Sequence, residues 1–175
     1  VTVNRLAQQH KLGSAEFAST DTFGGTAGDE LTLTVGTGSF TLDLSSAKTL
    51  QEIQAAINVE SNETGVTAGL ITGDSGNQTL VLTSGSSGYD HRVQLSFGGS
   101  LDASTFNFSM LNRDADDQLL GGEAELDASL TVAGVSVTRA INSGSDVIDG
   151  LTLHLPPDGQ ATVSLAAVAG GATTA

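Results

Sequence analysis

The strongest constraint on the fold is a period-two alternation of apolar and polar residues that glycine-containing turns interrupt. Apolar and polar residues alternate over residues 31–35 and again over residues 40–44, with the turn 36–38 between them. Successive side chains of a strand point to opposite faces, so each segment predicts a strand with one buried face. Two such strands joined by a short glycine turn predict a β-hairpin.

Similar segments recur along the rest of the chain. The further predicted strands cover residues 1–6, 66–71, 79–83, 93–97, 130–132, 135–138, 151–155 and 161–165. The chain has 22 glycines but 6 phenylalanines, 1 tyrosine and no tryptophan or cysteine. This composition favours thin sheets joined by glycine turns, without one thick aromatic core.

One segment has helical periodicity. Thr49 and Glu52 have the spacing of a capping box, in which each side chain hydrogen-bonds the backbone of the other residue. Leu50, Ile53 and Ile57 follow on a single helical face, and we expect this stripe to lie on a face of the hairpin. The sequence thus predicts one full helix.

Several segments have weaker patterns. Residues 98–120 show one alternation, Phe106-Phe108-Met110, which predicts a strand. Val147 and Ile148 predict an apolar helical turn that ends at Gly150, and the small residues 166–175 predict a frayed tail.

The predicted fold class is α+β and predominantly β, with two small domains of antiparallel sheets and hairpins. We expect a short helix or helical turn to pack on the sheet of each domain. The chain opens at Val1 without a methionine, and we expect it to be a fragment of a longer protein.

The charge balance limits the kinds of partner. The chain has 20 acidic and 6 basic residues, a formal net charge of −14, and no Lys/Arg cluster. Such a surface repels nucleic acid and anionic lipid, so we expect neither as a partner. No apolar run approaches the roughly 20 residues that span a bilayer.

Motifs for catalysis or metal binding are incomplete. Gly73-Asp74-Ser75-Gly76 resembles the nucleophile segment of trypsin-like proteases, but none of the three histidines has the sequence context of the catalytic base, so we interpret it as a turn. Asp114, Asp116 and Asp117 could begin a calcium loop, but Leu119 occupies the position that requires glycine. No two histidines have metal-ligand spacing. We therefore expect no enzyme activity, cofactor or metal.

Two signatures resemble known flagellar proteins. Thr49, Leu50, Ile53, Ile57 and Asn58, followed by Gly65 and Val66, resemble the IN motif, in which a capped helix ends in Ile-Asn before a returning strand. A second signature consists of residues 130–139 around Gly134, then Asn142 and residues 147–153 around Gly150. In order and combination, these signatures resemble the central head domains of the flagellar hook-associated protein 2 family, the filament-capping proteins.

This resemblance implies a domain division and a function. Residues 1–24 plus 121–175 would form a discontinuous head domain, with residues 25–120 inserted as a second domain. The family implies a structural protein at the extracellular tip of the bacterial flagellum, which forms ring-like homo-oligomers and promotes flagellin assembly. It supplies no catalytic residue.

Two other functions remain open on the sequence. One is a surface adhesin module that binds mucin or host glycans through loops such as residues 84–92 or 98–120. The other is a hydrolase with a dispersed carboxylate pair. Because like-charged heads repel, we expect this chain to be monomeric or weakly associated at low salt.

Overall fold

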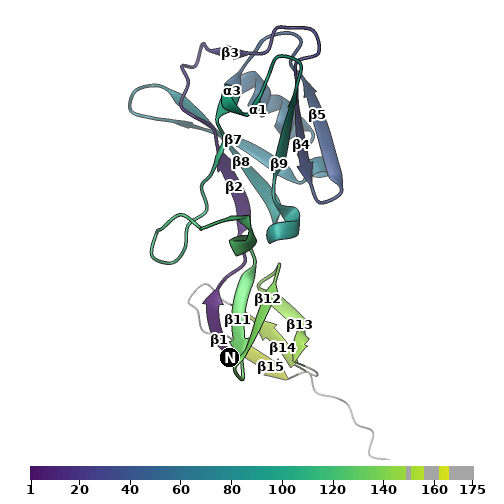
Figure 1. The fold of residues 1–175 in the computed structure, drawn as a ribbon, viewed down its shortest axis with the longest axis vertical. Helices are drawn as coiled ribbons and strands as arrows, with labels where there is room; N and C mark the ends of the chain where they lie inside the picture. The colour runs from purple at the N-terminus through teal and green to yellow at the C-terminus, as the bar shows by residue number, and fades with distance from the viewer. Residues whose placement is uncertain (149–150, 156–161, 166–175) are drawn as a thin grey trace, which may run out of the picture.

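The chain folds into two lobes stacked along its long axis and joined at a narrow waist (Figure 1). The structure, a computed structural model, describes residues 1–148, 151–155 and 162–165. The predicted class, predominantly β with short helices packed on antiparallel sheets, is confirmed. The chain crosses the waist twice, between β1 and β2 and again before β11 (Figure 1).

The larger lobe contains two main sheets. One has the order β10-β2-β8-β7, with all neighbours antiparallel. Its strands are β10 (Ser109–Met110), β2 (Gln9–Gly13), β8 (Gln78–Ser87) and β7 (Val66–Thr72). The other has the order β5-β4-β9. Its strands are β5 (Gly38–Asp43), β4 (Glu30–Val35) and β9 (Gln94–Gly98), and the short strands β3 (Thr22–Phe23) and β6 (Lys48–Thr49) pair beside it.

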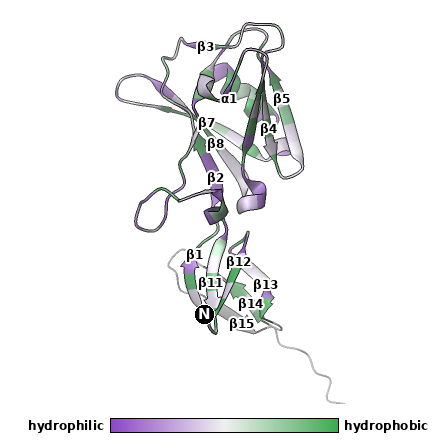
Figure 2. Cartoon of the chain, in the orientation of Figure 1, coloured by the Kyte–Doolittle hydropathy of each residue, from purple (hydrophilic) through white to green (hydrophobic). Residues whose placement is uncertain are grey.

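The predicted hairpin and helix form in this lobe. Strands β4 and β5 pair over the predicted turn, and the buried residues of β4 alternate with half-buried threonines. Figure 2 shows this alternation of apolar and polar residues along strands of both lobes. Helix α1 (Leu50–Val59) contacts β5, β7 and β8, so it lies on both sheets rather than on the hairpin alone. Its neighbour α2 (Ser61–Thr64) ends at Gly65.

The core of the larger lobe is more aromatic than the composition suggests. Phe106 stacks on Phe23 at a centroid distance of 4.5 Å, on Phe108 at 5.7 Å and on Phe97 at 6.0 Å. Phe17 meets Phe23 edge-on at 4.9 Å. The expectation of a core without an aromatic centre is therefore wrong here, because the fold gathers five of the chain's 6 phenylalanines at one place.

Two weakly patterned segments differ from prediction in this lobe. Ala103–Phe106 form the short helix α3, because Asp102 caps it and accepts a hydrogen bond from the Ser104 amide at 2.8 Å. Only Ser109 and Met110 of the predicted strand extend the sheet. Strand β2 was not predicted, since its buried positions are His10 and Gly13 rather than large apolar residues.

The smaller lobe has two three-stranded sheets. The first, in the order β1-β11-β12, contains β1 (Thr2–Arg5), β11 (Ala128–Val132) and β12 (Val135–Arg139). The second contains β13 (Ser143–Ile148), β14 (Leu151–His154) and β15 (Thr162–Leu165). Its core includes Ala7, Ala128, Leu130, Leu153 and Leu155.

The helical turn predicted at Val147 and Ile148 is wrong. Both residues lie in β13, where Ile148 pairs with Leu151 of β14. The 3₁₀ helices η1 (Tyr89–His91) and η2 (Glu123–Leu126) lie at the waist instead. Gly150, the turn predicted at residues 156–159 and the predicted tail at 166–175 lie outside the described residues.

Candidate functional site

The helix of the IN-like segment begins at a complete capping box. The Thr49 amide donates to Glu52 Oε2 at 2.8 Å, and the Glu52 amide donates to Thr49 Oγ1 at 3.3 Å. The hydrogen bonds from the backbone and hydroxyl of Thr49 lower the pKa of the Glu52 carboxyl below its usual value. The carboxylate also lies in the first turn, where the helix dipole favours negative charge.

The apolar stripe of this helix is fully buried. Leu50, Ile53 and Ile57 are each at most 1% exposed. They belong to the same apolar cluster as Val66, the first residue of β7, which is also fully buried. The stripe therefore connects the helix to the strand that returns beside it.

Asn58 connects the end of α1 to the free edge of β7. Its Nδ2 donates to the Ala68 carbonyl at 2.8 Å, and its Oδ1 accepts from the Ala68 amide at 2.8 Å. Strand β7 is an edge strand of its sheet. The side-chain amide thus satisfies backbone groups that no neighbouring strand would pair, and blocks that stretch of edge from further strand addition.

Asn142 makes the same kind of contact in the smaller lobe. Its Oδ1 accepts from the Ala7 amide at 2.7 Å, and its Nδ2 donates to the Ala7 carbonyl at 2.9 Å. Its own carbonyl accepts from the Leu155 amide at 2.8 Å. Asn142 therefore joins the segment after β1 to the end of β14.

A third asparagine, Asn112, has a comparable role that the sequence did not reveal. It is 3% exposed, accepts from the Lys11 amide at 2.8 Å, and donates to the Gln9 carbonyl at 2.7 Å and to Gln8 Oε1 at 2.9 Å. It therefore fixes the segment after β10 against β2. No local pattern marks it, because its partners lie about a hundred residues away in the chain.

Two of the predicted motif glycines occupy turns that need positive φ. Gly65 ends α2 with φ of 68°. Gly134 has φ of 86° in the two-residue turn between β11 and β12, beside Ala133 with φ of 49°. Glycine adopts this region at little cost, whereas other residues are strained there.

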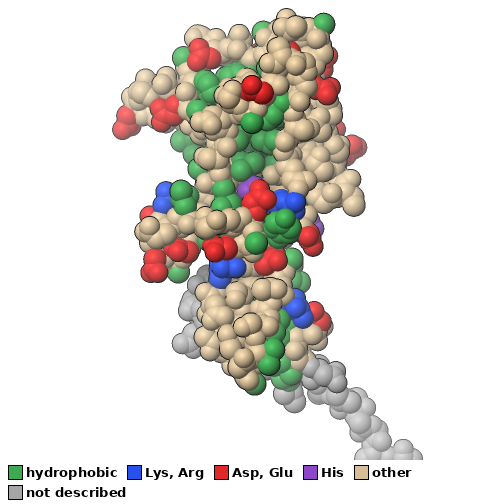
Figure 3. Space-filling model, in the orientation of Figure 1, with side chains coloured by type: hydrophobic (Ala, Val, Ile, Leu, Met, Phe, Trp, Pro, Cys, Tyr) green, Lys and Arg blue, Asp and Glu red, His purple; other side chains and the backbone are tan. Residues whose placement is uncertain are grey.

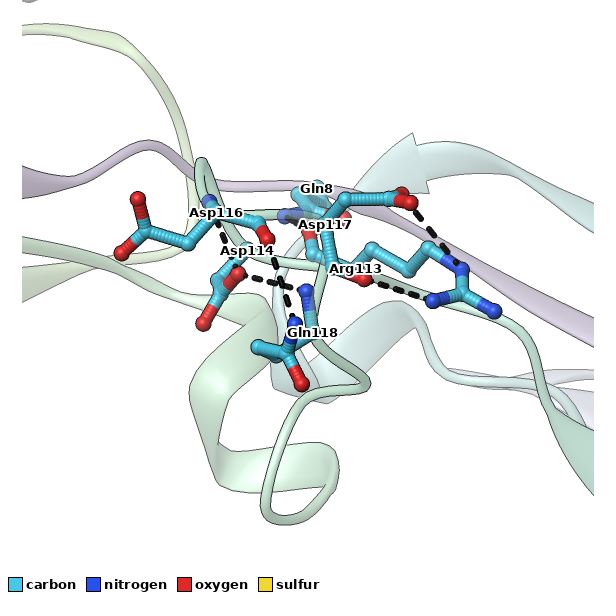
Figure 4. Close-up of polar contacts among 6 residues, drawn as sticks. All are labelled: Gln8, Arg113, Asp114, Asp116, Asp117 and Gln118. Atoms are coloured by element: carbon cyan, nitrogen blue, oxygen red, sulfur yellow. Dashed lines mark hydrogen bonds and ion pairs between the residues drawn. The ribbon is translucent and has the colours of Figure 1, made fainter.

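The acidic loop after β10 is held by its own backbone and side chains (Figure 4). Asp114 Oδ1 accepts from the amides of Asp116 and Gln118, each at 2.9 Å. Arg113 pairs with Asp117 at 3.7 Å and donates to its carbonyl at 2.6 Å, and the Asp116 carboxylate points away from the cluster (Figure 4). Asp114 thus acts as a turn-forming residue. Among the described residues, no group of three or more His, Cys, Asp or Glu side chains could hold a metal ion.

The protease-like segment forms an exposed turn between β7 and β8. Ser75 Oγ accepts from the Asn77 amide at 3.3 Å, and the Gly73 amide donates to the Asn77 carbonyl at 2.9 Å. Within the described part of the chain, no hydrogen bond connects Ser75 to a histidine.

Two of the grooves formed by the described residues contain carboxylates. One, of about 610 Å³, runs beside β9 and contains a single carboxylate, that of Glu123, which pairs with Arg92 at 3.0 Å. The other, of about 700 Å³, contains Asp114, Asp116 and Glu125. Glu125 accepts from the Gly121 amide at 2.9 Å, so it and Asp114 stabilise local turns. None of the described helices is long and apolar enough to cross a membrane.

A comparison with known protein families identifies the segment that contains α1 and its neighbouring strands. Residues 30–86, which include the hairpin, α1 and β7, match the family described as the flagellin hook IN motif. The chain thus carries this motif, as its sequence predicts.

Relatives extend the similarity over most of the chain. It is 30% identical over 158 residues to the A-type flagellar hook-associated protein 2 of Pseudomonas aeruginosa, and 36% identical over 96 residues to flagellar hook-associated protein 2 of Vibrio cholerae. These alignments cover 88% and 55% of this chain. The chain spans only 31% and 14% of the two relatives.

Solved structures show the same fold. The D1-D2-D3 domains of the Escherichia coli flagellar cap protein FliD match with a TM-score of 0.70 and 25% identity, over 94% of this chain and 48% of that one. FliD (HAP2) from P. aeruginosa PAO1 matches with a TM-score of 0.62 and 27% identity, over 94% and 77%. The predicted resemblance to flagellar hook-associated protein 2 is therefore confirmed.

Proposed function

We propose that this chain is part of the head of a bacterial flagellar filament cap, which promotes flagellin assembly at the filament tip. The observation that carries the proposal is the match to cap-protein structures over 94% of the chain, including both lobes. The cap would lie outside the cell at the distal end of the flagellum. The comparisons give no support to the adhesin alternative or to mucin as a ligand.

The chain acts in this proposal through shape and contact, without catalysis. The hydrogen-bonded loops and the contact of Asn58 with the free edge of β7 suit a stiff structural module. The partners would be other copies of the cap protein, in a ring-like homo-oligomer, and flagellin. The described motif residues would hold the two lobes in shape rather than contact a substrate: Thr49, Leu50, Ile53, Ile57, Asn58, Gly65, Val66, Gly134 and Asn142.

We also propose that the two lobes are separate domains, one inserted into the other. The predicted boundary placed residues 1–24 with residues 121–175. Strand β2 pairs with β8, and Phe17 and Phe23 pack in the core of the larger lobe. We therefore draw the first boundary near Gln8, where the chain crosses the waist.

Complementation tests the proposed function. The gene for the full-length protein would be deleted in the source bacterium and then restored on a plasmid. We expect the deletion strain to release unpolymerised flagellin and to be non-motile, and the plasmid to restore filaments. Normal filaments in the deletion strain would reject the proposal. A plasmid that lacks the codons for residues 9–120 separates the contribution of the larger lobe from that of the rest of the protein.

A further inference from the structure

A short segment of the larger lobe, residues 87–92, contacts the smaller lobe, and we call it the junction segment. Ser87 Oγ donates to the Ala140 carbonyl at 2.7 Å, and the Tyr89 amide donates to Asp127 Oδ1 at 2.8 Å. Arg92, which lines the groove of about 610 Å³, pairs with Glu123 of η2 at 3.0 Å. Each of these contacts connects the larger lobe to the smaller one, so the segment sets how the lobes sit.

The junction segment lies in close contact with its neighbours at Gly88, so it cannot move without breaking these contacts. Gly88 has φ of 91°, and its amide donates to the Gln8 carbonyl at 3.0 Å. A Cβ atom added at Gly88 would lie 2.5 Å from the Ala140 Cβ. Side chains visible in Figure 3 show Lys and Arg gathered near this waist, while Asp and Glu are spread over the length of the molecule.

His10 of β2 hydrogen-bonds a residue on each side of the junction segment, Ser84 before it and Val93 after it. Its backbone amide donates to Ser84 Oγ at 2.9 Å, and its ring Nδ1 accepts from the Val93 amide at 3.0 Å. The residue is 0% exposed. A single buried side chain thus anchors Val93, immediately after the junction segment.

This contact exists only for the neutral ring. A backbone amide can only donate, so Nδ1 must carry a lone pair and Nε2 must carry the proton. Protonation of Nδ1 would place two N–H groups against each other inside the protein. Burial of the ring also lowers the pKa of His10 below its ordinary value of 6.5, with an opposing effect from Glu123 and a supporting one from Arg92.

The other charged groups on η1 and η2 do not take part in the hydrogen bond between the His10 ring and Val93. Asp90 lies on η1 and Glu125 on η2, and neither hydrogen-bonds the His10 ring. His91 Nδ1 lies 3.1 Å from the Ser87 carbonyl, where it donates a hydrogen bond that protonation would keep. Of His10 and His91, the two histidines beside the junction segment, only His10 makes a hydrogen bond that protonation of the ring would break.

We propose that His10 is a proton-sensitive lock between the lobes. The neutral ring holds Val93 and keeps the junction segment against the smaller lobe. The protonated ring releases Val93, so the junction segment opens and the lobes can reorient. The two lobes are thus fixed relative to each other at neutral pH and can move relative to each other in mild acid.

Amide hydrogen exchange of this chain between pH 8 and pH 5 tests the lock, with protection factors corrected for intrinsic exchange. The reporters are the amides of Gly88, Tyr89 and Val93, and the reference is the Ala68 amide. Because opening takes up one proton, the reporters should lose about tenfold protection per pH unit between about pH 6.5 and the lowered pKa of the folded state. The reference should not follow this slope.

Substitutions separate the lock from general acid effects. In His10→Asn, the side-chain oxygen can accept from Val93 but does not titrate, so reporter protection should become independent of pH. His154→Asn, at an exposed position of β14, and His91→Asn should keep the wild-type slope. Flat wild-type profiles, or an unchanged slope in His10→Asn, would overturn the proposal.

Direct NMR titration of the His10 ring keeps the test informative if His10→Asn does not fold. We expect the Nε2–H tautomer at pH 7 and a midpoint below 6.5 that coincides with the end of the protection loss. A midpoint at or above 6.5, or an Nδ1–H tautomer, would reject the lock.

Discussion

The side-chain amide of Asn58 forms hydrogen bonds with both backbone polar groups of Ala68, each at 2.8 Å. It therefore replaces a neighbouring strand at the free edge of β7. The Asn142 side chain likewise forms hydrogen bonds with both backbone polar groups of Ala7, at 2.7 and 2.9 Å. One chemical device thus supports each lobe, and it explains why an asparagine follows the apolar stripe of α1.

Removal of the Asn58 amide should destabilise the larger lobe. In Asn58→Ala, the Ala68 amide loses its partner, while Gln54 still donates to the Ala68 carbonyl at 3.3 Å. We expect the free energy of unfolding to fall by about 1–3 kcal/mol. Urea denaturation measures it, and Gln51→Ala, an exposed position on the same helix, should change it by less than about 0.5 kcal/mol. Equal effects of the two substitutions would contradict the role of Asn58.

Asn112→Ala should have an effect at least as large, because it breaks three hydrogen bonds of a residue that is 3% exposed. We expect a loss of about 2–3 kcal/mol and faster exchange of the Leu111 and Leu120 amides. Asp116→Ala is the matched control, since its carboxylate points away from the other residues of the loop (Figure 4). Unchanged exchange at Leu111 would show that Asn112 does not hold this segment.

Gly88→Ala should disturb the waist, because a side chain at φ of 91° is strained and its Cβ would lie 2.5 Å from the Ala140 Cβ. The backbone strain alone costs about 1–3 kcal/mol. Gly122→Ala is the control: no atom lies within 4 Å of an added Cβ. Its φ of 172° is extended. Thermal unfolding distinguishes them, and equal tolerance of both substitutions would contradict the close approach at the waist.

Acid should remove the contribution of the Glu52 charge to stability. The pKa of the folded-state carboxyl is below its ordinary value of 4.5, so the folded state binds fewer protons than the unfolded state. The stabilisation is fully present above about pH 5.5 and is lost as the pH falls through the folded-state pKa. The difference in unfolding free energy between wild type and Glu52→Gln should shrink over this range. A constant difference would show that the charge has no part in the cap.

Association of isolated chains should depend on salt. At a formal net charge of −14, copies repel one another at low ionic strength. Sedimentation velocity should show monomers or weak oligomers at about 10 mM salt and stronger association at about 500 mM, where the Debye length is only a few ångströms. A tight ring in dilute protein at low salt would contradict this prediction.

Local patterns predicted the parts of the fold that depend on neighbouring residues. The hairpin β4–β5, the capping box at Thr49 and the buried Ile53 stripe all follow from spacing within a few residues. Strand β2 did not follow, because its buried positions include a histidine whose partners are Ser84 and Val93. Its burial depends on contacts made by distant parts of the chain.

Capping and aromatic packing explain the other differences. Asp102 turns the chain into α3 and directs Phe106 into the core, so the predicted strand is reduced to β10. Val147 lies in β13 because β14 offers a partner, although its local sequence also suits a helical turn. The role of Asn112 could not be predicted, since nothing within a few residues marks it as buried.

The proposed location at the filament tip can be measured directly. Ser75 lies in an exposed turn, so Ser75→Cys in the full-length protein offers a site for a maleimide-linked gold or fluorescent label, with the unsubstituted protein as the labelling control. Electron or fluorescence microscopy of labelled cells should show one signal at the distal end of each filament. Label distributed along the filaments, or absent from flagella of motile cells, would contradict the account.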